Sequence, residues 1–226
     1  EHGLRLSAYA SDRGESWQDH AESNKQSVTL RHDWRISDTT QVKNIASYNH
    51  LKADMTGSLN ANDFSKRQGY SYQTFTYREV DATRLSSQLN HSWNEQQKSQ
   101  MTVYYRDNTT EQNPSYNIRT DVVSGVPTGT YSGQTTYNAF QSYGLNVQHS
   151  ANFDPVKFTI GVMAEHSPNQ AKTNDIEVFR DPNTLVYTGY EHRQLLRELK
   201  VDVNNQGLDT QANWQALPNL NLVGGA

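Results

Sequence analysis

The apolar residues of this chain recur with a period of two. The clearest example runs from 85 to 106. Its apolar residues share one parity on each side of a polar turn, with Leu85, Leu89 and Trp93 before it and Met101, Val103 and Tyr105 after it. Polar residues occupy the alternate positions of both segments. This alternation predicts two strands, each with one apolar and one polar face.

The same hairpin pattern repeats along the chain. It predicts nine strands, at about 4–10, 28–34, 41–52, 72–93, 99–107, 143–153, 158–164, from beyond 186 to 214, and from 220 onward. The third strand is ambiguous, because Val42, Ala46 and Tyr48 lie on one side and Ile45 and Leu51 on the other. Polar loops are expected at about 13–26, 53–70, 108–139 and 166–186, and short turns at 37–40, 94–98, 154–155 and 217–219.

Long and short connections alternate in this prediction, which is typical of outer-membrane barrels with long extracellular loops and short periplasmic turns. In each strand that leads into a short turn, the last residue on the apolar face is a large aromatic: Trp34, Trp93, Phe153 and Trp214. Such residues suit a membrane–water boundary, where an apolar ring meets a polar surface. The alternative is that aromatic residues simply favour strands, in which case their depth and parity would scatter.

Composition is poor in apolar residues for a soluble globule, with 34% hydrophobic residues and a mean hydropathy of −0.90. Disorder is one explanation. The net charge of only −4, the 13 tyrosines and the 4 tryptophans argue against it. A membrane barrel needs only a short outward apolar band, so its mean hydropathy can be low. A soluble β-sandwich would have shorter strands and loops.

Several classes are excluded or disfavoured. The absence of cysteine rules out a disulfide scaffold or thiolate metal site, and no apolar run reaches the length of a transmembrane helix. The mildly acidic charge without a basic cluster argues against nucleic acid. Nine strands cannot close the usual even-numbered barrel. We therefore expect residues 1–226 to be a single partial barrel domain, truncated at both ends and unable to fold alone.

Several segments resemble early barrel strands of TonB-dependent outer-membrane receptors. They are 3–9 with 17–20, 29–34, 104–108 and 112–116. The resemblance implies an all-β antiparallel transmembrane barrel of about 22 strands, of which this chain supplies about nine. It also implies a plug domain inside the barrel and a TonB box ahead of it. No segment here resembles either, so the TonB complex would be engaged through a missing N-terminal region.

Catalytic chemistry finds no support in the sequence. It contains no HExxH, EF-hand, GxSxG or phosphate-loop motif, so we expect no enzyme, no metal site and no cofactor. His32, His91 and His149 fall on the outward parity near boundary aromatics. His20 lies on a loop between Asp19 and Glu22, which is a weak candidate for cation binding.

Candidate ligand-binding residues come from the inward parity and the loops. Arg84, Tyr104 and Arg106 point inward if the apolar parity points outward, and Tyr116 and Arg119 extend the site along the longest loop. Arginine offers a planar fork for carboxylates, and tyrosine adds stacking area. The alternative is that these lumen charges form ion-pair ladders or contact a plug.

The functional prediction is an active-transport receptor of the bacterial outer membrane. It would bind a scarce small molecule, such as a ferric siderophore, and import it with TonB-derived energy, in contact with outer-membrane lipid. The siderophore is what the resemblance implies as a default. The alternatives are a passive porin-like channel and a soluble secreted β-rich adhesin or glycan-binding module.

Overall fold

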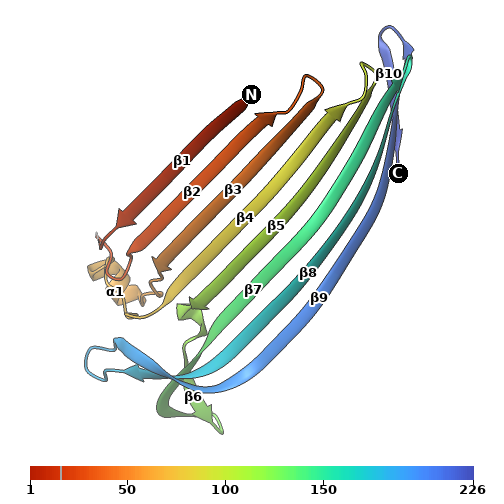
Figure 1. Ribbon diagram of the computed structural model, residues 1–226. Coiled ribbons are helices and arrows are strands. Elements are labelled where there is room, and N and C mark those ends of the chain that lie inside the picture. Colours follow the sequence, from red (N-terminus) through yellow and green to blue (C-terminus); the bar gives the residue numbers. More distant parts are fainter. Residues whose placement is uncertain (16) are drawn as a thin grey trace.

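The computed structural model describes residues 1–15 and 17–226, which form one antiparallel ten-stranded sheet. The strands are β1 (His2–Arg13), β2 (Ser23–Arg35), β3 (Thr40–Asp54), β4 (Tyr77–Ser92), β5 (Gln97–Asn113), β6 (Arg119–Val123), β7 (Val126–Phe153), β8 (Val156–Arg180), β9 (Tyr187–Leu217) and β10 (Leu220–Gly225). The helices are α1 (Ala61–Lys66) and the 3-10 turn η1 (Ser115–Asn117). In the sheet the strands follow chain order from β1 to β10, except that β6 pairs only with β7 (Figure 1). The nine predicted strands are those of this meander.

The connections at one end of the sheet are all short, as predicted. They comprise residues 36–39, 93–96, 154–155 and 218–219. At the opposite end, which we call the loop end, the connections are 14–22, 55–76, 114–125 and 181–186. The predicted loop at 166–186 is therefore wrong, because β8 continues to Arg180 and only a tight turn separates it from β9.

The predicted loop at 108–139 is also wrong in most of its length. β5 continues to Asn113, β7 begins at Val126, and β6 lies between them. In these extensions polar residues occupy both faces of the strands, so hydropathy does not alternate. Period-two reasoning detects only strands with one apolar face. It therefore ends each strand where the apolar band ends, although the hydrogen-bonded ladder continues.

The register carries one apolar face across neighbouring strands. Leu30 of β2 pairs with Leu6 of β1 and with Ala46 of β3, and Leu85 of β4 pairs with Ala46 and with Tyr105 of β5. Directly paired residues point to the same side of a sheet. The ambiguous third strand is thereby resolved, since its Ala46 parity shares the apolar face.

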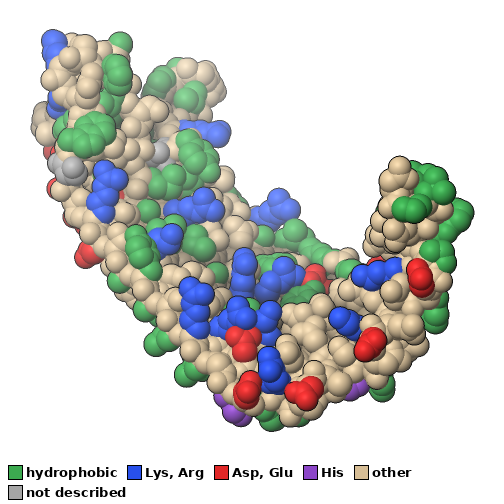
Figure 2. Space-filling model, turned by 90° about the horizontal axis from the view of Figure 1, so that it is seen from above, with side chains coloured by type: hydrophobic (Ala, Val, Ile, Leu, Met, Phe, Trp, Pro, Cys, Tyr) green, Lys and Arg blue, Asp and Glu red, His purple; other side chains and the backbone are tan. Residues whose placement is uncertain are grey.

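The sheet is a single curved layer, and its two faces differ in chemistry. In Figure 2 the cross-section is a crescent, with Lys and Arg side chains in and beside its hollow and with hydrophobic side chains, histidines and some acidic side chains along its outer rim. We call these the concave and convex faces. The outward parity predicted from the sequence lies on the convex face, with exposed side chains such as Leu145 (40% exposed), Val162 (47%) and Leu208 (67%).

The described residues contain almost no hydrophobic core. Only Tyr72, Ala151, Ile176 and Val178 are buried hydrophobic residues among them. A soluble β-sandwich would bury its apolar faces between two sheets. This sheet instead leaves its apolar face uncovered over several strands, as a membrane barrel does toward lipid. Within the described residues, no helix is long and apolar enough to cross a membrane.

The 55–76 connection is held by a polar cluster around α1. The Asn60 side chain caps the helix by accepting a hydrogen bond from the Asp63 backbone N–H. The buried Asp63 carboxylate accepts hydrogen bonds from Arg67 (2.8 Å) and from the Tyr72 hydroxyl. These two contacts, Arg67 first, lower the pKa of Asp63 to about 2.

The same connection docks against the start of β9. The Tyr187 N–H donates to the Tyr72 carbonyl (2.7 Å), Gln73 forms a parallel bridge with Tyr187, and the Phe75 and Tyr190 rings lie 5.2 Å apart. In Figure 1 the loop end of the β8–β9 hairpin bends across the end of β7 towards the side of the sheet where α1 lies.

Candidate ligand-binding surfaces

A polar cluster on the concave face unites two of the predicted ligand residues. The Arg106 guanidinium contacts Glu165 of β8 (2.5 Å between Nη2 and Oε2) and donates from Nε to Ser142 of β7 (2.9 Å). The Tyr104 hydroxyl donates to the same Glu165 carboxylate. The Glu165 side chain is 13% exposed and that of Arg106 is 36% exposed. The cluster is thus a partly buried ion pair spanning β5, β7 and β8.

The register explains how these side chains meet. Tyr104 pairs with Gly144 of β7, and Gly144 pairs with Glu165. A Cβ at Gly144 would collide with the Tyr104 ring. The glycine therefore lets the tyrosine lie flat across β7 and reach the carboxylate on β8. The Phe140 ring, 5.5 Å from the guanidinium, gives Arg106 an apolar side.

Arg84 has a different environment. It pairs directly with Arg106 across β4 and β5, so the two arginines share the concave face. Arg84 is exposed, and no ion pair within 1–15 and 17–226 involves it. Arg106 is already neutralised by Glu165. Arg84 is therefore the inward arginine of this pair that can attract an external anion.

A second surface lies at the loop end, where an arginine sits among tyrosines. The Arg180 guanidinium carbon lies 4.9 Å from the Tyr187 ring centroid and 5.3 Å from that of Tyr131. Its Nη1 donates to the Tyr131 hydroxyl (3.1 Å) and its Nε to the Leu185 carbonyl (2.8 Å). Burial raises the pKa of the Tyr187 hydroxyl.

Arg180, Leu185 and Tyr187 border a cavity of about 400 Å³. It is lined by Ser58, Leu59, Asn60, Tyr72, Gln73, Tyr116, Arg180, Leu185 and Tyr187. The lining thus comes from the 55–76 connection, η1 and the β8–β9 turn. A pocket of this size, with aromatic walls and a few polar groups, is suited to a small molecule.

The predicted site residues fall into two groups that do not converge. Tyr116 is 69% exposed and belongs to the loop-end cavity, whereas Arg119 is exposed at the start of β6 and pairs with Ser132. Seven residues of strand separate Arg106 from Asn113 at the end of β5, about 23 Å at the usual strand rise. A single small molecule cannot touch both groups.

The predicted boundary aromatics lie together at the short-turn end of the sheet. Trp34 is near the end of β2, Trp93 directly follows β4, Phe153 ends β7 and Trp214 is near the end of β9. They are 40%, 62%, 60% and 47% exposed. Trp34 pairs with Val42 and Trp214 with Val156, so the register gives them the apolar parity.

Sequence reasoning missed Glu165, Ser142, Arg180 and Tyr131. Glu165 and Ser142 are inward, but only the register of β5, β7 and β8 reveals that they face Tyr104 and Arg106. Arg180 lay inside the loop predicted at 166–186. Its available signal was the Asp-Pro-Asn turn that follows it, where the Asp181 carboxylate accepts from the Asn183 N–H (2.7 Å).

The loop histidine singled out in the sequence is already engaged. His20 Nδ1 lies 3.5 Å from Asp54, and its Nε2 lies 2.8 Å from the Thr76 carbonyl oxygen. Both ring nitrogens thus tie the 14–22 connection to its neighbours. The predicted grouping of His20 with Asp19 and Glu22 has no counterpart among these contacts.

Comparison with known proteins identifies the fold. No family model and no curated protein sequence matches the chain. Solved structures do match, among them the ferripyoverdine receptor of the outer membrane of Pseudomonas aeruginosa, with a TM-score of 0.75, 14% identity and 98% of this chain covered. The ferric-catecholate import receptor Fiu from E. coli K12 matches with a TM-score of 0.64 and 9% identity, and the copper transporter OprC with 0.64 and 15%. The chain spans 32%, 39% and 31% of these three chains, respectively. The protein therefore has the antiparallel barrel-wall fold of outer-membrane receptors.

Proposed function

We propose that the chain forms part of the barrel of a TonB-dependent receptor in the bacterial outer membrane. The observation that carries this proposal is the single curved sheet, whose convex apolar face is not covered by any of the described residues. A soluble adhesin or glycan-binding module would have to leave this face in water, and burial of apolar surface is the main favourable term in folding. Lipid would cover it instead.

The proposed task is capture and import of a scarce small anion-bearing molecule, such as a ferric siderophore. The loop-end cavity offers the Arg180 guanidinium beside the Tyr187 ring, which suits a flat ligand carrying carboxylate or phenolate oxygens. Arg84 and the Tyr104–Arg106 cluster lie farther along the concave face, where they could form successive contacts during passage. Tyr116 and Arg119 would act at the entrance. The chemistry is binding, without catalysis.

The second candidate, a passive porin-like channel, differs in its use of energy. A TonB-dependent receptor would transport against a gradient through a plug domain, whereas a channel would only equilibrate its solute. The ferripyoverdine receptor, the ferric-catecholate import receptor and the copper transporter named above share the fold at low identity. They support import of a metal complex as the first class of cargo to test.

The test uses the full-length protein in cells grown under iron limitation. Uptake of radiolabelled iron would be measured with a panel of ferric citrate, ferric catecholate and ferric hydroxamate complexes, with and without a functional TonB system. The proposal requires uptake of at least one complex that depends on both the receptor and TonB. Uptake that continues unchanged without TonB would support the channel. Protein recovered entirely from the aqueous phase after detergent partitioning would overturn the membrane assignment.

A further inference from the structure

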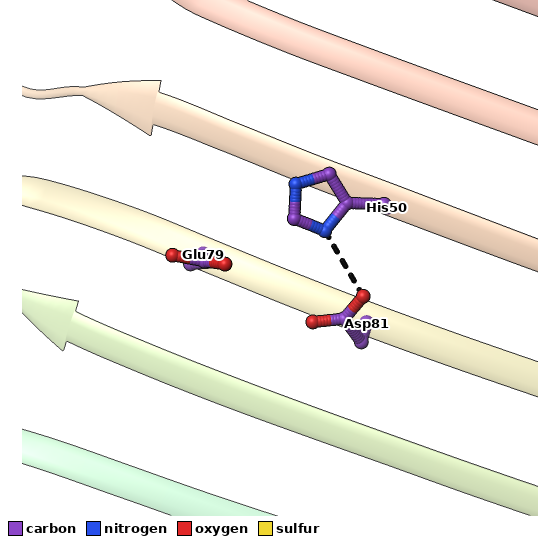
Figure 3. Close-up of side chains that lie close together, drawn as sticks. All are labelled: His50, Glu79 and Asp81. Carbon is purple, nitrogen blue, oxygen red and sulfur yellow. Dashed lines mark hydrogen bonds and ion pairs between the residues drawn. The ribbon is translucent and has the colours of Figure 1, made fainter.

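A group of side chains that could hold a metal ion lies on the convex face near the loop end of β3 and β4, away from both ligand surfaces. Figure 3 shows His50 of β3 beside Asp81 and Glu79 of β4. One possible donor atom from each of these residues lies within 4.8 Å of the other two. The three side chains come from paired positions, because His50 pairs with Asp81 and Glu79 lies two residues away on the same face.

The group is partly sheltered and already ordered. The exposed fractions of the side chains are 22% for His50, 39% for Asp81 and 33% for Glu79. His50 Nδ1 lies 3.0 Å from Asp81 Oδ1, and the Tyr48 hydroxyl donates to the same oxygen (2.6 Å). Asp81 Oδ2 makes none of these contacts, so it is available to a further partner. These contacts hold the imidazole and the carboxylate in a fixed relation before any ion binds.

The surrounding charge favours a cation. Glu79 pairs directly with Glu111 of β5, and like charges in directly opposed positions are destabilising. Asp107 has the same parity on β5 as Glu111 and extends the acidic surface. Lys52, 3.6 Å from Glu79, is the cation that β3, β4 and β5 place within this patch. Four carboxylates thus share one lysine and one histidine.

We propose that His50, Glu79 and Asp81 bind a divalent transition-metal ion of the zinc class. An imidazole with two carboxylates suits zinc, whereas calcium and magnesium prefer oxygen ligands alone. Ligands about 2.1 Å from a tetrahedral ion lie about 3.4 Å apart. Donor atoms separated by up to 4.8 Å would therefore approach by at most about 1.4 Å, which the long Glu79 side chain can accommodate by releasing Lys52.

The site goes beyond the proposed import function, because it faces away from the concave surface along which cargo would move. A bound ion would instead link β3 to β4 and offset the repulsion between the opposed glutamates. Its expected consequence is stabilisation of this part of the barrel wall, since an ion that binds only the folded state raises its stability.

The test measures zinc binding to the full-length protein in detergent micelles by calorimetry and by the visible absorption of substituted cobalt. We expect the wild-type protein to bind one zinc ion. In His50→Gln and in Asp81→Asn the zinc affinity should fall at least about tenfold or be lost, since even residues that only orient ligands contribute about 10–100-fold. His166→Gln is the matched control. His166 is also on the convex face but contacts Asn204 (2.7 Å) rather than a carboxylate.

A folded-barrel check by unboiled gel mobility accompanies each variant. A variant that fails to fold is replaced by Glu79→Gln, and the wild-type cobalt spectrum provides an independent measurement of histidine ligation. Unchanged zinc affinity in folded His50→Gln and Asp81→Asn would overturn the proposal. So would a cobalt spectrum typical of six oxygen ligands, or calcium binding that does not depend on His50.

Discussion

The Arg106–Glu165 pair allows a quantitative test of whether the concave cluster is structural. We expect the two residues to be coupled by about 1–2 kcal/mol in the free energy of unfolding. Hydrogen bonds to charged groups contribute about 1.5–3 kcal/mol, whereas exposed ion pairs contribute about 0.2–1 kcal/mol. Glu165 is 13% exposed and Arg106 36%, so the pair falls between these classes.

The assay is a double-mutant cycle with Arg106→Gln, Glu165→Gln and the double variant, in full-length protein refolded into lipid vesicles and unfolded with urea. Glutamine matches the shape of glutamate and stays polar at both positions, although it is shorter than arginine. The cycle subtracts the effect of each single substitution, so its coupling term reports the interaction between the two side chains. At 1.4 kcal/mol, the coupling would be a tenfold effect on the unfolding equilibrium.

Arg31 and Asp33 provide a matched control pair. They form a 2.7 Å ion pair on the same face, with both side chains more exposed at 43% and 44%. Their coupling should stay below about 0.5 kcal/mol. A coupling near zero for Arg106 and Glu165, or equal values for the two pairs, would refute the argument from burial. The cluster would then be free to rearrange around a ligand.

Three further predictions test other parts of the structure. Val162→Arg, midway along the convex apolar face, should cost about 2–4 kcal/mol in vesicle-based unfolding, while Asn146→Arg on the concave face should cost much less. Because the pKa of Asp63 is about 2, the Asp63 carboxylate should stabilise α1 fully above the ordinary pKa of an aspartate and lose this effect as the pH falls toward 2. Amide exchange of residues 61–70 would measure this pH dependence, and Asp63→Asn should abolish it. Gly144→Ala should cost about 1–3 kcal/mol by displacing the tyrosine ring that crosses it, whereas Gly189→Ala, with open space around the added carbon, should be nearly neutral.

The sequence was sufficient to predict the meander and its faces. Strict alternation, as in Leu85 to Tyr105, depends on one face being apolar and the other polar, and this asymmetry holds along the central part of the strands. It also predicted correctly that the short turns share one end. The parity of the third strand could not be determined locally, because Ile45 on the concave face competes with Ala46 on the convex face. Only pairing with β2 and β4 decided between them.

The candidate sites were less predictable because they depend on register over long sequence separations. Tyr104 and Arg106 were assigned to the concave face correctly, yet their partner Glu165 is 61 and 59 residues away, respectively. A shift of one residue between strands would move it to the other face. Arg180 was missed for a different reason. From Glu165 to Asp175 both faces of β8 are mostly polar, so the strand signal is interrupted before the short alternation of Ile176 and Val178 beside Arg180.

Two neighbouring arginines of the concave face differ in what they contact. Arg106 is neutralised by Glu165 and fixes the strands, while its direct neighbour Arg84 is exposed and unpaired among the described residues. A paired cation adds little attraction for an incoming anion, whereas an exposed unpaired one retains its full charge. Arg84 would therefore contribute to ligand affinity with little effect on stability, and Arg106 would do the reverse. The sequence pattern does not distinguish the two arginines. They differ because β8 places the Glu165 carboxylate within reach of Arg106.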